Sequence, residues 1–141
     1  MRVAAKKKRL PKVKINAKSE VTEGKVILSL PLVAVSEANN FEYWRKKNER
    51  HQFQKRVVAS LLKPVKDRIT LPCNINLKRL APRKLDKHDN LPMSMKYILD
   101  ACCAIITGDF RPGRADDDER ITVSYDQKSS REYGVEVEFT F

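Results

Sequence analysis

Apolar residues recur along the first half of this chain with two different periods, and each period predicts a type of element. Residues 25–35 are rich in Val, Ile and Leu, which predicts a strand. Residues 41–62 place apolar side chains three to four positions apart, which predicts a helix. The apolar stripe expected on this helix consists of Phe53, Val57 and Leu61, with Val58 and Leu62 beside them.

The second half of the chain repeats this change of period. Residues 73–80 alternate apolar and polar side chains, which is typical of a half-buried strand. A second helix is expected over residues 91–107, with Asp89 or Asn90 as its cap and Gly108 as its end.

Two further alternating segments follow the second helix. Residues 121–125 and 133–141 both place apolar side chains at every second position, so each predicts a strand. A short turn-forming segment at 127–130 separates them, and we therefore expect the two strands to form a hairpin.

These elements predict one α+β domain. Their order is β-α-β-α-β-β, and we expect a mixed sheet of about four strands with two main helices. The length of 141 residues suits a single domain. Residues 1–23 are Lys-rich and lack periodicity, so we expect a basic, flexible N-terminal arm there and the folded domain over 24–141.

Charge is divided unevenly between the two halves of the chain. The formal net charge is +11. Residues 1–18 hold eight basic and no acidic side chains, and residues 41–68 hold nine basic and three acidic ones. Residues 85–141 reverse this balance, with twelve acidic and seven basic side chains. This division favours a protein that contacts phosphates with one surface and binds a metal with another.

Several other classes are disfavoured. No apolar run is long enough to cross a membrane, and the basic start is not followed by the apolar segment of a secretory signal. Three cysteines cannot form a disulfide framework, so we expect a cytoplasmic protein with buried thiols. The four glycines form no phosphate-binding loop.

Two acidic clusters flank the second predicted helix. Asp86 and Asp89 precede it, and the run Asp116–Glu119 follows it. If the chain returns along the helix, the two clusters approach each other and offer the oxygen ligands that Mg²⁺ or Mn²⁺ prefers. Such an ion activates water near a phosphodiester, and Lys96 on the helix would bind the phosphate.

Three sequence elements resemble RusA-type Holliday junction resolvases. They are Leu85-Asp-Lys-His-Asp-Asn-Leu91, Lys96-Tyr-Ile-Leu-Asp100-Ala, and Asp117-Asp-Glu-Arg-Ile121. In that family an Asp-x-Asp-Asn-Leu element leads into a helix with Lys-x-x-x-Asp-Ala, and an Asp-Asp pair precedes a strand. The resemblance covers residues 25–141 and implies a RusA-like fold. It also implies a phage or prophage origin.

The resemblance implies a homodimeric endonuclease that cuts four-way DNA junctions symmetrically with Mg²⁺ or Mn²⁺. Asp89 and Asp118 match two of the family's metal-binding carboxylates, and Lys96 matches the catalytic lysine. The family's first Asp falls on Lys87 in this chain, so Asp86 would replace it, unless His88 or no residue does. Further metal-binding candidates beside Asp118 are Asp116 and Asp117.

Six basic residues are expected to follow the DNA phosphates. They are Lys46, Lys47, Arg50, Lys78, Arg79 and Arg83. The substrate implies two active sites related by two-fold symmetry, and therefore a homodimer. The alternatives are a non-catalytic, structure-selective nucleic-acid-binding protein, or a structural or regulatory phage protein, on a degenerate nuclease scaffold.

Overall fold

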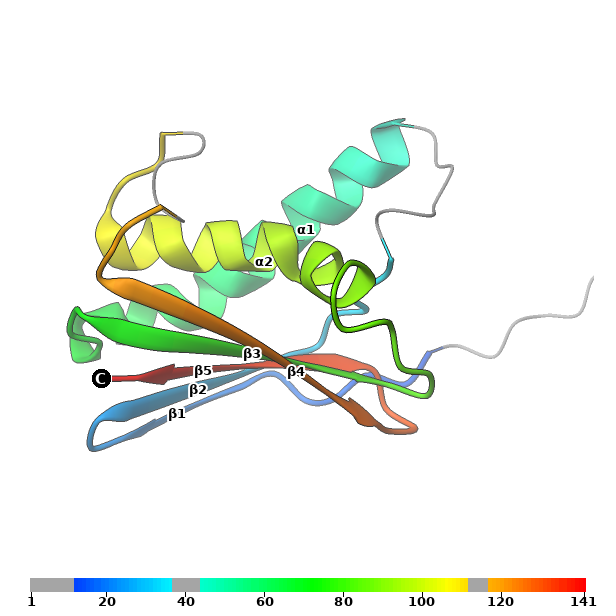
Figure 1. Ribbon diagram of the computed structural model, residues 1–141, viewed down its shortest axis with the longest axis horizontal. Helices are drawn as coiled ribbons and strands as arrows, with labels where there is room; N and C mark the ends of the chain where they lie inside the picture. The colour runs from blue at the N-terminus through cyan, green and yellow to red at the C-terminus, as the bar shows by residue number, and fades with distance from the viewer. Residues whose placement is uncertain (1–11, 37–43, 112–116) are drawn as a thin grey trace, which may run out of the picture.

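Five strands form one mixed sheet, and two helices cover one of its faces (Figure 1). The structure is a computed structural model, and it describes residues 12–36, 44–111 and 117–141. The strand order is β1-β2-β5-β3-β4. The predicted α+β class, with two main helices, is confirmed. The sheet has one strand more than the approximate count expected from the sequence, namely β1.

The sheet begins with a hairpin of β1 (Lys18–Thr22) and β2 (Lys25–Leu30). Gly24 has a positive φ of 73° in the turn between them, a conformation that glycine adopts without steric cost. β2 alternates half-buried and buried residues and ends before Pro31. Because β1 belongs to the sheet, the flexible arm predicted over residues 1–23 is wrong for residues 18–22. Residues 1–11 lie outside the described residues.

The central part of the sheet is built by β3 (Cys73–Ala81), β4 (Ile121–Ser129) and β5 (Gly134–Thr140). β3 lies between the other two strands, parallel to β4 and antiparallel to β5. The predicted hairpin of the last two strands is therefore wrong. The chain leaves β4, crosses the end of β3, and returns on its far side as β5 next to β2.

The helical layer contains α1 (Trp44–Leu62), a 3₁₀ helix η1 (Lys63–Arg68) and α2 (Asn90–Thr107). α2 has two packing surfaces, because it contacts both α1 and the sheet. It ends at Gly108, as predicted, where a positive φ of 73° lets the glycine N–H donate to the Ala104 carbonyl at 2.9 Å.

The core lies between this helical layer and the sheet. Its largest members include Phe139, Leu28 and Ile98, all fully buried. The three cysteines are buried free thiols, as predicted, and burial raises the pKa of Cys102. The opposite face of the sheet carries polar side chains, among them the ion pair of Lys25 and Glu138 at 2.9 Å. Within the described residues, no helix has the length and apolar character to cross a membrane.

Candidate functional site

The turn before α2 is organised by the carboxylate of Asp86. One of its oxygens accepts the backbone N–H of Asp89 at 2.9 Å. The other accepts the backbone N–H of Asn90 at 3.2 Å and the Asn90 side-chain amide at 2.5 Å. These hydrogen bonds lower the pKa of Asp86, the backbone bond from Asp89 contributing most. Asp86 therefore caps the helix. The side chain of Asp89, one of the two expected caps, forms no capping bond. The side-chain amide of Asn90, the other expected cap, donates to Asp86 itself.

Asp118 lies in the turn before β4 and is held by Arg120. Its two carboxylate oxygens accept Arg120 Nε at 2.9 Å and the terminal guanidinium nitrogen at 2.6 Å. This bidentate pair lowers the pKa of Asp118 to about 2. The neighbouring Asp117 is exposed, and Asp116 lies outside the described residues.

The two predicted parts of the metal site lie at opposite ends of the sheet (Figure 1). Beside Asp86, the backbone of Leu85 bonds to the side chain of Gln127, near the end of β4. Asp118 precedes the start of β4. The six residue-to-residue steps from Ile121 to Gln127 span about 20 Å, so Asp86 and Asp118 cannot share an ion.

The described residues therefore do not fit the predicted Mg²⁺ or Mn²⁺ site. Among them, no three His, Cys, Asp or Glu side chains are grouped so that they could hold a metal ion. Lys96 is exposed on α2, and Asp89 and His88 are exposed in the turn before it. No reaction step follows from this arrangement.

The six predicted phosphate-binding residues also fall on different surfaces. Lys46, Lys47 and Arg50 lie on α1, whereas Lys78 lies on the opposite, polar face of the sheet, where it approaches Glu136 to 3.9 Å. Arg83 is exposed in the loop after β3. These residues do not form the single DNA-binding surface that the sequence suggested.

Arg79 has a structural role instead. Its side chain is buried on the helical side of β3, with 8% of the residue exposed. Its Nε donates to the Ala34 carbonyl at 2.9 Å, and a terminal nitrogen donates to the Arg83 carbonyl at 2.7 Å. Burial lowers the pKa of Arg79. The guanidinium thus joins the segment after β2 to the segment after β3.

The buried side of α1 matches the predicted stripe only in part, because Val58 and Leu62 face the core as expected whereas Phe53 does not. The residues that face the core are His51, Gln54, Val58 and Leu62. Phe53 is 43% exposed, and its predicted neighbours Val57 and Leu61 are only partly buried. The His51 ring stacks on Tyr97 of α2 at a centroid distance of 3.4 Å. Gln54 is 2% exposed, and its Nε2 is a buried donor that has no hydrogen-bond partner among the described residues.

The outer side of α1 and η1 is strongly basic. Across residues 44–68 there are nine Lys and Arg and two acidic residues. Arg45, Arg56 and Lys63 follow one another at intervals of eleven and seven residues, which are nearly whole helical turns, so they lie on the same side. We call these three residues the basic row. All three are exposed.

The N-terminal segment adds positive charge beside this helix. The residue after Lys14, Ile15, donates its backbone N–H to the Tyr133 carbonyl at 3.0 Å, which fixes the segment against the sheet. The Lys14 ammonium lies 5.8 Å from the centre of the Phe53 ring. Arg45 lies in the same way over Trp44, at 5.4 Å. Each of these two exposed aromatic rings on α1 therefore has a cation near its face.

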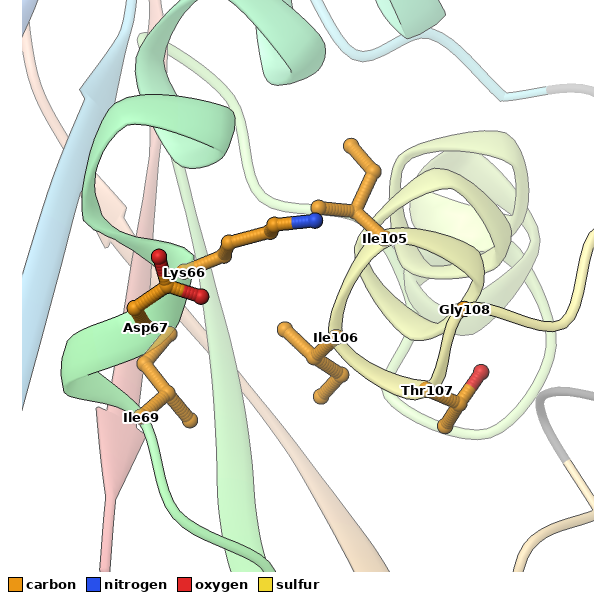
Figure 2. Close-up of a pocket in the computed structure, with 7 residues that line it drawn as sticks. All are labelled: Lys66, Asp67, Ile69, Ile105, Ile106, Thr107 and Gly108. Atoms are coloured by element: carbon orange, nitrogen blue, oxygen red, sulfur yellow. The ribbon is translucent and has the colours of Figure 1, made fainter.

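A separate hollow of about 380 Å³ lies between η1 and the end of α2 (Figure 2). Figure 2 shows Lys66 reaching from η1 towards α2, with Ile69 and Ile106 on the two sides of the hollow. The complete lining is Lys66, Asp67, Ile69, Ile105, Ile106, Thr107 and Gly108. Sequence reasoning did not identify this hollow, since its walls come from segments about forty residues apart.

Comparison with known proteins gives several similar solved structures, of which two are described. The first is the periplasmic domain of Helicobacter pylori MotB, with 13% identity and a TM-score of 0.43, covering 90% of this chain and 83% of that one. The second is the OmpA-like domain of FopA1 from Francisella tularensis, with 18% identity and a TM-score of 0.38, covering 86% and 77%. No protein-family model matches the chain, and no curated protein matches it.

The identification made from the sequence is corrected by the structure. Asp86 and Asp118, two carboxylates of the metal site that the resemblance implied, lie at opposite ends of the sheet. Membership of the RusA-type family, the endonuclease activity and the four-way junction as partner are therefore corrected. Neither of the two similar structures is described as a resolvase. The two alternative functions on a degenerate nuclease scaffold rest on the same resemblance, so they are no longer supported. The homodimer was inferred from the junction substrate, and it is no longer supported either. At these sequence identities and TM-scores, the two similar structures assign no function to this chain.

Proposed function

We propose that this domain is a binding module for an extended polyanion, which it contacts along the outer side of α1 and η1. The observation that carries the proposal is the basic row of Arg45, Arg56 and Lys63. Arg45 and Arg56 are about 16 Å apart along the helix axis. A row of this length suits a polymer with repeated negative charges better than a single small anion.

The charges of this surface are available for a partner. Within the described ranges, neither Arg56 nor Lys63 forms an ion pair. Glu49 and Asp67 are the acidic residues within residues 44–68, so local neutralisation is weak. Attraction by such a surface extends over about 8 Å at physiological ionic strength. Lys14, whose ammonium lies over the Phe53 ring of the same helix, adds to the positive charge on α1.

The direct test is binding of labelled inorganic polyphosphate, measured by fluorescence anisotropy. We expect the double variant Arg56→Gln, Lys63→Gln to bind roughly tenfold more weakly, equivalent to about 1.4 kcal/mol. A matched control is Lys128→Gln, Arg131→Gln, which removes two exposed charges from the β4 side of the molecule. The control should retain affinity.

Salt and polymer type give a second measurement. If about four phosphates are contacted, binding of a linear duplex should weaken roughly 100-fold between 50 and 200 mM salt. A four-way junction of equal charge should bind no more tightly than the linear duplex. Heparin shows whether sulfate replaces phosphate. Equal loss of affinity in both double variants would show that net charge alone carries binding, and it would overturn the proposal.

A further inference from the structure

β4 forms one edge of the sheet, and among the described residues it has a strand, β3, on one side only (Figure 1). It is nine residues long and contains neither Pro nor Gly, the residues that commonly interrupt edge strands. An edge of this length presents backbone groups that can pair with another strand. The side chains of β4 then determine which strand fits.

Alternate residues of β4 direct their backbone groups away from β3. At the start of the strand, the Arg120 carbonyl accepts the Cys73 N–H at 2.9 Å. Past its end, the Ser130 N–H donates to the Ala81 carbonyl at 3.0 Å. Even-numbered residues therefore bond to β3 in the parallel ladder, and odd-numbered residues such as Val123 direct their N–H and C=O groups outwards.

Two of the outward N–H groups are already bonded within the chain. The Ile121 N–H donates to the Asp118 carbonyl at 3.1 Å, and the Gln127 N–H donates to the Asp126 carboxylate at 2.8 Å. The part of the edge between them is centred on Val123. An antiparallel pairing of two copies with a two-fold axis at Val123 uses this part and leaves both local bonds intact.

The exposed polar face of β4 is complementary to itself in this register. Thr122 lies opposite Ser124 of the second copy, and Arg120, immediately before the strand, lies opposite Asp126. Two-fold symmetry makes each pair occur twice. A shift of the second strand by two residues, to an axis at Ser124, would place Arg120 opposite Lys128 and replace attraction by repulsion. The charges therefore specify one register.

Arg120 is oriented for this contact. Its Nε and one terminal nitrogen are held by the Asp118 carboxylate, at 2.9 and 2.6 Å. Its other terminal nitrogen forms no hydrogen bond within the described residues and carries two N–H donors for the Asp126 carboxylate of the second copy.

The hydroxyl pair is matched in donors and acceptors. The Thr122 hydroxyl accepts the Asn74 amide at 2.9 Å and keeps its own proton. The Ser124 hydroxyl donates its proton to Asn76 at 3.1 Å and keeps its capacity to accept. The Thr122 hydroxyl of each copy can therefore donate to Ser124 of the other.

The helical side of the same edge is apolar. Ile121 is buried, and Val123 and Tyr125 are partly buried. In the same register Tyr125 lies beside Ile121 of the second copy, a favourable cross-strand combination of an aromatic and a β-branched side chain. We propose that two copies of this chain pair antiparallel through their β4 strands, about an axis at Val123, into one continuous sheet. This pairing requires no DNA and is independent of the polyanion surface on α1 and η1.

The expected association is weak, because five paired residues bury less surface than a standard interface of about 1,600 Å². We expect a dimer Kd of about 0.1 mM. Sedimentation velocity between about 10 μM and 1 mM should show a shift from monomer to dimer at physiological salt. A monomer throughout this range would overturn the proposal.

Hydrogen exchange locates the paired edge. Over the same concentrations the Val123 amide should exchange severalfold more slowly, because its N–H enters the new pairing. The Thr122 amide, which is directed at β3, should not change. Concentration-dependent protection on β1 in place of Val123 would show that the other edge pairs, and it would contradict the proposal.

Charge reversal tests the register. Asp126→Arg places two arginines opposite each other, and Arg120→Asp places two carboxylates opposite each other, so each variant alone should dimerise at least about tenfold more weakly. Asp126→Arg also releases the Gln127 N–H, which would favour edge pairing, so a loss reports on the charges. An equimolar mixture of the two variants restores opposite charges at both contacts and should recover dimerisation as a heterodimer, which also shows that both variants are folded.

The matched control is Glu20→Arg, the same change of charge at an exposed position on β1, the other edge of the sheet. It should leave dimerisation unchanged. Equal weakening in Glu20→Arg, unchanged dimerisation in Asp126→Arg, or no recovery in the mixture would each overturn the proposal.

Discussion

The carboxylate of Asp86 accepts hydrogen bonds from both the backbone and the side-chain amide of Asn90, at 3.2 and 2.5 Å. Because these bonds favour the ionised form, the pKa of Asp86 is lower in the folded protein than in the unfolded chain. The stabilisation is therefore present above the ordinary carboxyl pKa and is lost as pH falls through the lowered value.

Replacement of this cap should lower the melting temperature. We expect Asp86→Ala to melt at a lower temperature than the unmodified protein at neutral pH, and the difference should shrink below pH 3.8, the ordinary value for this group. Thermal unfolding followed by circular dichroism measures both. Asp89→Ala is the control, since the Asp89 side chain forms no capping bond. An equal loss in the two variants would contradict the assignment of the cap.

Arg79 should be important for stability although it does not belong to a binding surface. In Arg79→Met the carbonyls of Ala34 and Arg83 lose their donor, so the free energy of unfolding should fall by about 2 kcal/mol. Lys78→Met is the control on the polar face of the same strand, where a half-exposed pair at 3.9 Å contributes little. Urea denaturation should separate the two variants clearly.

Replacement of Gln54 should stabilise the protein, whereas replacement of Arg79 should destabilise it. Its Nε2 is buried without a hydrogen-bond partner, so removal of this donor should relieve a desolvation cost. Gln54→Met is expected to raise the free energy of unfolding by about 1 kcal/mol. Gln52→Met, at an exposed position of the same helix, should give no gain. A loss of stability in Gln54→Met would mean that the amide makes a net favourable contribution.

Gly24 and Gly108, the two glycines with positive φ among the described residues, should respond differently to alanine. A Cβ at Gly24 would lie 3.0 Å from the Phe141 carbonyl oxygen, whereas a Cβ at Gly108 would meet nothing within 4 Å. Both variants incur the left-handed backbone cost of roughly 1 kcal/mol. Gly24→Ala should therefore be the less stable of the two in denaturant titrations, and equal losses would count against close contact at this turn.

Magnesium should leave the protein unchanged. Because Asp86 and Asp118 lie at opposite ends of β4, and Asp118 is occupied by Arg120, we expect no change in melting temperature when Mg²⁺ replaces EDTA. Titration calorimetry with Mn²⁺ gives an independent reading. A saturable heat that disappears in Asp118→Asn would restore the predicted metal site.

The sequence predicted the order of elements well, because local periodicity determines most of them. α2 begins one residue before its predicted start and ends at its predicted residue, and β3 differs by one residue at its end. α1 was harder to interpret. Its apolar content is low, so the buried stripe is selected by packing against α2, and the helix turns Gln54 inwards and Phe53 outwards.

The candidate site failed for a topological reason. We assumed that the chain returns along the second helix, which would bring the two acidic clusters together. Instead α2 connects the parallel strands β3 and β4, and such a crossover carries the chain from the end of one strand to the start of the next. Residues before and after the helix must then lie at opposite ends. Nothing in the local pattern of residues 121–129 distinguishes parallel from antiparallel pairing.

The position of β5 has a consequence for how the sheet assembles. β1 and β2 pair with each other, as do β3 and β4, but the two pairs are joined only through β5. Residues 134–140 therefore close the sheet, and in a nascent chain that has not yet released them the two strand pairs have no strand to join them. Productive folding during synthesis must wait for this strand to leave the ribosome.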